Sequence, residues 1–120
     1  MDKQQVFDAV KVAYKALDDK MGIDIKVIDI SLVSPIADYF VIASASNSSQ
    51  LRAMADSVEE QLHKQCGIEK THIEGFQTKS WILLDFNDIV VHLFNEEDRE
   101  FYNIERIWAD AKVVDEKDLK

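Results

Sequence analysis

The sequence contains one cysteine, one proline and three glycines among its 120 residues. The lone Cys66 cannot form a disulfide within the chain or supply several thiolates to a metal, so we expect a reducing, cytoplasmic location. So few glycines and prolines argue against disorder and against a β-sandwich with many tight turns. The glycines are also far apart, which excludes the glycine-rich loops that bind dinucleotides or the phosphates of ATP.

Long apolar runs and clusters of basic residues are also missing. No apolar stretch approaches the ~20 residues that cross a bilayer, and the acidic, amphipathic start predicts no signal peptide. We therefore expect no membrane contact. Lys and Arg number 14 against 23 Asp and Glu, a formal net charge of −9. This balance predicts little direct nucleic-acid contact and favours a basic protein partner, unless the acidity only keeps the protein soluble.

The length suits one domain with a core of its own. An Asp2–Gln5 capping box opens a helix that stops near Gly22, and Asn47 or a neighbouring serine caps a second helix that ends at Gly67. We expect strands at 23–30, 38–44, 80–85 and 88–94, a weak edge strand at 68–73, and a last helix at 97–108. The predicted fold class is α/β (α+β), a mixed β-sheet with flanking helices, in a single domain over 1–111. The charged tail at 112–120 is expected to fray.

The hairpin around a predicted Phe86-Asn87 turn is the most informative feature. Trp81, Leu83 and Asp85 alternate with Ile82 and Leu84, so each arm carries large apolar groups on both faces. Three sizeable helices can hardly cover both faces of the sheet. An uncovered face would be an interaction patch; the alternative is ordinary core packing.

The sequence gives only weak indications of catalytic groups. Asp85 and Asp88 flank the turn and could hold Mg²⁺, but they do not alternate along one strand, which favours solvated turn carboxylates. The serines at 46–49 could bind an anion at a helix N-terminus, although capping is favoured. His92, mid-strand among apolar residues, is interpreted as a hydrogen-bonded, half-buried side chain or a partner contact. Cys66 with His63 lacks a third partner, so an idle thiol is favoured.

Taken in order, several segments resemble the ribosomal silencing factor (Iojap-like) family across residues 7–111. The matching segments are 38–42 (DYFVI), Gln50 with 53–55 (AMA), 74–76 (EGF), 81–94 (WILLDFNDIVVHLF), Arg99 with Tyr102, and 105–111 (ERIWADA). The family usually has Gly where this chain has Ala45, Asn87 and Ala109. Asn tolerates left-handed backbone, whereas the loops at Ala45 and Ala109 are expected to differ locally.

The resemblance implies a sheet topology similar to the nucleotidyltransferase superfamily, without its catalytic signature. It implies a non-catalytic translational repressor that needs no cofactor or metal. The implied partner is L-fourteen, a protein of the large ribosomal subunit, whose occupancy keeps the small subunit from joining when nutrients run short. Some members look dimeric when free. The implied partner-binding residues are Tyr39, Glu74, Trp81, Leu83, Asp85, His92, Phe94 and Tyr102. Of these, Trp81 and Leu83 would be the anchors, and Asp85 and Glu74 would contact basic groups of the partner.

Two other functions remain open. A nucleotidyltransferase-like enzyme would use Asp85, Asp88 and the serine loop with Mg²⁺. A dimeric scaffold would bury its exposed sheet face against its own copy.

Overall fold

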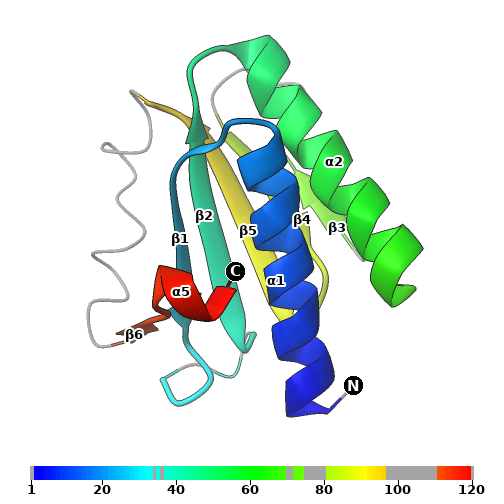
Figure 1. Cartoon of the computed structure of the whole chain (residues 1–120), viewed down its shortest axis with the longest axis vertical. Helices are drawn as coiled ribbons and strands as arrows, with labels where there is room; N and C mark the ends of the chain where they lie inside the picture. The colour runs from blue at the N-terminus through cyan, green and yellow to red at the C-terminus, as the bar shows by residue number, and fades with distance from the viewer. Residues whose placement is uncertain are drawn as a thin grey trace.

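The computed structural model describes residues 2–33, 35, 37–69, 72–74, 81–96 and 111–119, with the backbone alone at 72–74. Six strands form one sheet in the order β3-β4-β5-β2-β1-β6 (Figure 1). The strands are β1 (Ile23–Asp29), β2 (Tyr39–Ala45), β3 (His72–Glu74), β4 (Trp81–Asp85), β5 (Ile89–Asn95) and β6 (Lys112–Val113). β2 and β5 pair in parallel and every other pair is antiparallel, so the predicted mixed sheet is confirmed.

Both long helices begin where their capping residues predict, and α2 also ends at its predicted glycine. α1 (Lys3–Asp19) opens with the Asp2–Gln5 capping box, and α2 (Ser48–Cys66) opens with the Asn47 side chain accepting from the amide of Gln50. Gly67 closes α2 in the left-handed region, with φ 66°. Such a conformation costs little only in glycine.

The end of α1 uses its glycine differently from the prediction. Met21 takes the left-handed conformation there, with φ 61°. Gly22 instead lets the chain pass close to the helix, because a Cβ at this position would lie 3.0 Å from the Leu17 carbonyl oxygen. The glycine is therefore favoured by the close approach of the backbone and not by its dihedral angles.

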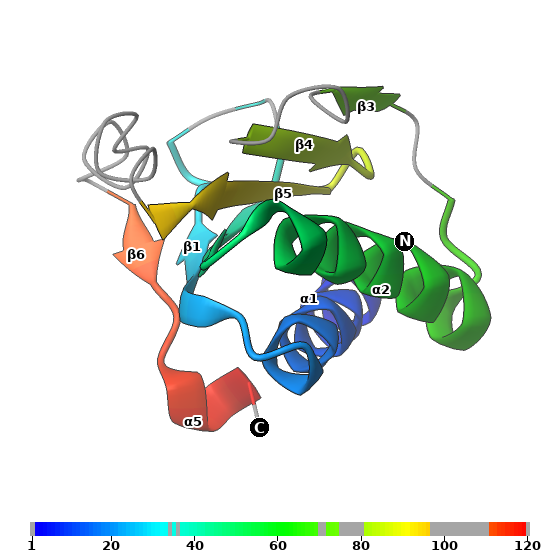
Figure 2. The same cartoon turned by 90° about the horizontal axis from the view of Figure 1, so that it is seen from above.

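The two long helices cover one face of the sheet (Figure 2). The apolar stripe of α2 is buried as its helical spacing predicts, and it packs with α1 and with inward-facing strand residues into the main core. Strand residues of this core include Val27, Val41, Ala43, Leu84 and Val91. None of the helices in the described part of the chain combines the length and apolar composition that crossing a bilayer requires.

The hairpin between β4 and β5 turns one residue later than expected. The amide of Phe86 donates to the carbonyl of Ile89 at 2.9 Å, so Asn87 and Asp88 form the loop. Asn87 has φ 73°, as the left-handed tolerance of asparagine allows. Phe86 is buried in the main core and is not part of the turn.

The tail, which the sequence predicts to fray, has a defined place in the fold. β6 pairs with the end of β1, and the amide of Val114 donates to the carbonyl of Val27 at 2.8 Å. α5 (Glu116–Leu119) then lies against α1, where the Tyr14 hydroxyl donates to the Glu116 carboxylate at 2.8 Å. Leu119 is only 4% exposed and Val114 packs against the main core, so two apolar side chains and a few polar contacts hold a segment that looks merely charged in the sequence.

Other differences are smaller. The weak edge strand is present as β3, shorter and later than the predicted 68–73. Ala45 lies buried at the end of β2 and is not among the described residues with positive φ, so no glycine-like loop occurs there. The helix expected at 97–108, and Ala109 with it, lie outside the described residues.

We expect Leu119→Ala to lower the free energy of unfolding by about 2 kcal/mol, because it removes a buried apolar side chain. Urea denaturation followed by circular dichroism measures this. Leu32→Ala is the matched control: Leu32 is 97% exposed, so its change should stay within about 0.5 kcal/mol. Equal effects of the two substitutions would contradict the packing of the C-terminal segment.

Candidate protein-interaction face

A second apolar cluster lies on the other face of the sheet. Strand residues alternate between the two faces, so the neighbours of the main-core residues point away from α1 and α2. The buried members are Ile28, Ile30, Ala37, Phe40, Ile42, Val90 and Phe94, with half-buried Trp81, Leu83 and Ala111 packed against them. Both faces of the sheet are therefore apolar, as the sequence predicts.

Three near-parallel rings form the centre of this face. Trp81 lies directly opposite Phe94 in the β4–β5 register, and their ring planes differ by 7° at a centroid separation of 6.0 Å. The His92 ring is within 5° of both, at 6.4 Å from each. Phe40 on β2 meets His92 edge-on at 4.7 Å. Aromatic contacts of this kind hold the Trp81 ring in one orientation and lower the entropy lost when a partner packs on it.

His92 is more deeply buried than expected. It is 5% exposed, and neither ring nitrogen has a hydrogen-bond partner among the described residues. Burial lowers the pKa of His92 from 6.5 to about 4, so the ring is neutral at physiological pH. A buried, unsatisfied imidazole costs about 1–3 kcal/mol relative to an apolar residue of similar shape.

Of the predicted contact residues on this face, only those of β4 are accessible. Trp81, Leu83 and Asp85 share one side of β4 and are each half-buried. Phe94 is 1% exposed and His92 lies beside it, so both support the surface from beneath. We define the β4 surface as Trp81, Leu83 and Asp85. The interaction patch predicted from the sequence is thus smaller than expected and lies on one strand.

The remaining predicted contact residues are distributed elsewhere. Tyr39 packs on the main core, on the helix-covered face. The centroid of its ring lies 6.1 Å from the centroid of the Phe7 ring. The backbone of Glu74 lies opposite Leu83 in the β3–β4 register, which places this residue beside the β4 surface. Tyr102 lies outside the described residues. The predicted contact residues therefore do not share one face of the sheet, since Tyr39 lies on the face opposite to the β4 surface.

Asp85 has a structural role in the hairpin. Its side-chain oxygen accepts a hydrogen bond from the Asn87 amide at 2.8 Å and so holds the left-handed turn. A carboxylate that also bonds the backbone has a fixed position, which suits it to a directional contact with a basic group.

The geometry gives little support to a metal site or to an anion site at the serine loop. Among the described residues, no three or more His, Cys, Asp or Glu side chains are grouped so as to hold a metal ion. At the serine loop, Gln50 accepts from the amide and hydroxyl of Ser46, while its own side-chain amide donates to the carbonyls of Lys20 and Met21. The loop is used for capping and for joining α2 to the turn after α1.

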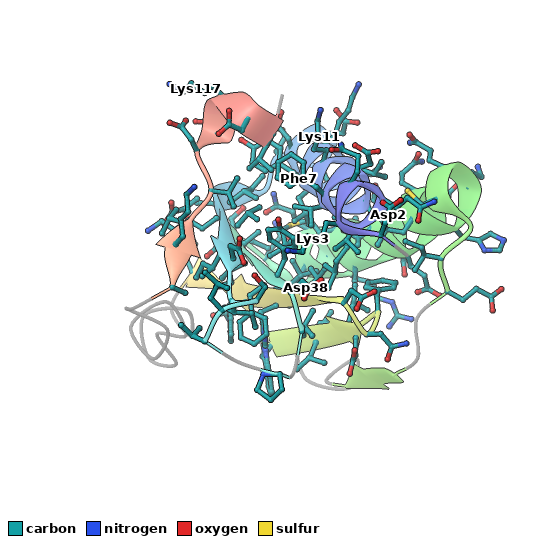
Figure 3. All side chains as sticks on the ribbon, turned by 90° about the horizontal axis from the view of Figure 1, so that it is seen from below. Asp2, Lys3, Phe7, Lys11, Asp38 and Lys117 are labelled. Atoms are coloured by element: carbon teal, nitrogen blue, oxygen red, sulfur yellow. The ribbon has the colours of Figure 1, made fainter. Side chains whose placement is uncertain are left out.

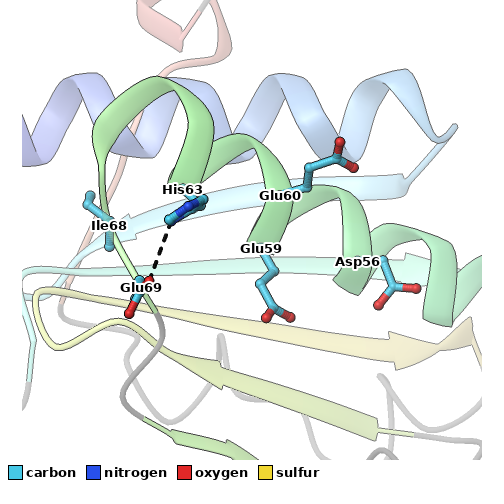
Figure 4. Close-up of a pocket in the computed structure, with 6 residues that line it drawn as sticks. All are labelled: Asp56, Glu59, Glu60, His63, Ile68 and Glu69. Atoms are coloured by element: carbon cyan, nitrogen blue, oxygen red, sulfur yellow. Dashed lines mark ion pairs between the residues drawn. The ribbon is translucent and has the colours of Figure 1, made fainter.

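The Cys66–His63 pair is equally unsuited to nucleophilic chemistry. Burial, with a smaller contribution from Asp8, raises the pKa of the Cys66 thiol, which keeps it protonated. His63 faces Glu69 at 3.7 Å instead, beside an acidic hollow of about 600 Å³ on the outer side of α2 (Figure 4). The hollow is lined by Asp56, Glu59, Glu60, His63, Ile68 and Glu69.

The contribution of β2 to the second apolar cluster was not predicted from the sequence. Phe40 and Ile42 lie opposite Val90 and His92 and extend the second cluster across the sheet centre. The available signal was the alternation within 38–44, which places Phe40 and Ile42 on one side and Val41 and Ala43 on the other.

The family model described as "Ribosomal silencing factor during starvation" matches residues 3–120. The chain belongs to this family. The ribosomal silencing factor of Bacillus subtilis is 38% identical over 106 residues, which cover 88% of this chain and 89% of that protein. A crystal structure of a Chromobacterium violaceum protein superposes with a TM-score of 0.83 at 32% identity, covering 91% of this chain and 88% of the other.

A protein whose name refers to an organelle is also similar to this chain. A mouse protein named "Mitochondrial assembly of ribosomal large subunit protein 1" is 36% identical over 88 residues, which cover 72% of this chain and 39% of the mouse protein. The matched family description names a silencing role and no reaction. The resemblance read from the sequence motifs is therefore confirmed.

We expect stability to fall as pH is lowered from 6.5 toward 4.5, since the folded-state pKa of His92 is about 4 and the unfolded chain takes up the proton first. The loss approaches about 3 kcal/mol over the full interval between the two pKa values. His92→Leu should remove this part of the pH dependence and raise stability near neutrality. Urea midpoints across this range test both points.

Leu32→Ala is the control, because Leu32 is 97% exposed and carries no titratable group, so this variant should keep the pH dependence of the parent chain. A His92→Leu chain with the same pH slope as the parent would show that His92 is not buried as a neutral ring.

Proposed function

We propose that this chain is a cytoplasmic translational repressor that binds the large ribosomal subunit through its protein L-fourteen. In this proposal it prevents the small subunit from joining when nutrients are limiting. It acts as a steric block and not as an enzyme, and it uses no cofactor. The single observation that carries the proposal is the β4 surface, combined with membership in a silencing-factor family.

The β4 surface has the composition of a binding hot spot. Tryptophan is among the residues that contribute most to protein interfaces, above all when it is surrounded by groups that exclude water. Trp81 rests on buried Phe94 and His92, and Leu83 beside it is half-buried. A partner therefore meets an aromatic anchor whose position is already set, with Asp85 supplying a directional polar contact.

Charge supports a basic partner and opposes nucleic acid. With a net charge of −9, the chain is repelled by the phosphates of ribosomal RNA and attracted to a basic ribosomal protein. Asp85, and Glu74 beside Leu83 in the register, would pair with basic groups of L-fourteen. The mouse relative's name refers to the large ribosomal subunit, which agrees with this choice of partner.

Steric exclusion needs only that the chain stays bound. The fold measures 35 × 33 × 27 Å, whereas groups that bridge two subunits must come within about 4 Å of one another. A body of this size at the intersubunit side of L-fourteen therefore prevents nearby bridges from forming. When free, two copies could cover the same surface, and the partner would then displace the second copy.

We expect the purified chain to pellet with isolated large subunits and to reduce their pairing with small subunits in sucrose gradients. Trp81→Ala should weaken binding by about 2 kcal/mol, a loss on the scale of hot-spot residues. Co-sedimentation at a series of concentrations measures the affinity.

Met21→Ala is the control, because Met21 is 79% exposed at the turn between α1 and β1 and carries no proposed contact. If the parent chain stays in the supernatant at micromolar concentration, the proposed function is wrong. If Trp81→Ala and Met21→Ala bind like the parent, docking uses another surface. Tight binding of nucleotide with Mg²⁺ in calorimetry would instead favour the enzyme.

A further inference from the structure

The fold contains a second candidate contact region, far from the β4 surface. A hollow of about 630 Å³ opens at the β1–β6 edge of the sheet, on the side of the main core. In Figure 3, Phe7 lies between α1 and the β6–α5 segment, at this edge. The lining residues are Phe7, Asp29, Tyr39, Lys112, Val113, Val114, Asp115 and Asp118.

One wall of the hollow is aromatic. The half-buried rings of Phe7 and Tyr39 lie 6.1 Å apart and are tilted by 54°, while each packs against the main core. The core therefore holds both rings in place, and their remaining surface lines the hollow. The face of an aromatic ring carries negative partial charge and attracts cations, and planar cations stack on it.

The polar rim has an excess of negative charge. Asp29, Asp115 and Asp118 supply three carboxylates against the ammonium of Lys112, and Lys117 pairs with Asp115 at 3.8 Å from just outside the lining, which leaves a formal charge of −1. Burial, followed by the charges of Asp29 and Asp38, raises the pKa of Tyr39, which agrees with a negative potential at its hydroxyl. This balance disfavours an anionic ligand.

The other two hollows lack this combination. The acidic hollow on α2 has no aromatic residue in its lining. The hollow between α1 and α2 includes Lys11 and Lys15 with Asp18 and Asp19, so its charges balance. Only the hollow at the β1–β6 edge, among these three in the described part of the chain, joins an aromatic wall to a negative rim.

We propose that the Phe7–Tyr39 hollow binds an arginine side chain of the basic protein on which this chain docks. A guanidinium is planar, so it can stack on a ring while its N–H groups pair with carboxylates. The ammonium of lysine offers a point charge without the flat face. The inference rests on the proposed function for its partner, and it gives Tyr39 a role separate from that of Trp81.

The hollow can be tested without the ribosome. We would titrate the full chain with a capped Gly-Arg-Gly peptide at low salt and follow the ring resonances of Phe7 and Tyr39 by NMR. The expected result is a saturable shift of both rings with a millimolar dissociation constant. The same peptide with citrulline, which keeps the shape and loses the charge, should give no saturable shift. Absence of binding, equal binding of citrulline, or equal binding of the lysine peptide would overturn the proposal.

Substitutions locate the site. Tyr39→Leu should weaken peptide binding at least threefold, whereas Tyr39→Phe keeps the ring and should bind like the parent. Asp118→Asn should also weaken binding about threefold. Asp8→Asn removes one charge from an exposed residue of α1 that does not line the hollow, and should leave the affinity unchanged. Thermal unfolding confirms that each variant is folded, and if Tyr39→Leu is not, Asp118→Asn against Asp8→Asn decides the matter.

Large-subunit binding then tests the source of the arginine. Asp118→Asn should weaken co-sedimentation about threefold while Asp8→Asn does not. A parent chain that binds the arginine peptide but never pellets with large subunits would refute the proposed function, and with it the source of the arginine, but not the arginine specificity of the hollow. A parent that pellets, with Asp118→Asn pelleting equally well, would overturn the assignment of this arginine to the docked partner.

Discussion

The parallel pairing of β2 with β5 is the constraint on which the rest of the molecule depends. It joins two antiparallel units, β1–β2 and β4–β5, into one sheet and sets which residues share a face. With Val41 opposite Val91, both point to the helices; with Ile42 opposite His92, both point away. A shift of one residue would exchange the two faces and place His92 under α1 and α2. The main core, the aromatic row and the orientation of Trp81 all follow from this register.

Because both faces of the sheet centre are buried, accessible groups are confined to its margins. One margin is β4, where Trp81 and Leu83 rest on a fixed aromatic layer. The other is the β1–β6 edge, where Tyr39 and Phe7 line a hollow with acidic residues around it. The same principle operates at each: the core supports an aromatic ring, and nearby carboxylates supply direction. Such surfaces suit recognition of a basic protein better than they suit chemistry, for which groups must converge in one enclosed site.

Much of the fold could be predicted because short-range rules decide it. The Asp2–Gln5 box, Asn47 and Gly67 mark helix ends through local hydrogen bonds and dihedral preferences, and the alternation along β4 assigns its faces correctly. The role of Leu119 could not be predicted, since its burial depends on α1, about a hundred residues earlier in the chain. Burial of His92 was missed for the same reason: it depends on Phe40 and Ile42, whose alignment with β5 is a long-range register. Tyr39 was grouped with Trp81 by family resemblance, and resemblance alone does not reveal on which face a residue lies.

The thin attachment of the β6–α5 segment has a dynamic consequence. Among the described residues, it is held to the sheet and α1 by two register pairs with β1, the Val114 amide and side chain, the Tyr14–Glu116 hydrogen bond and the Leu119 side chain. Segments with so few contacts open at a lower free energy than the global transition and exchange their amide hydrogens independently. The Val114 amide should thus lose protection while β2 and β5 keep theirs. Each such opening removes one wall of the Phe7–Tyr39 hollow, so the segment's local equilibrium sets how often that hollow exists.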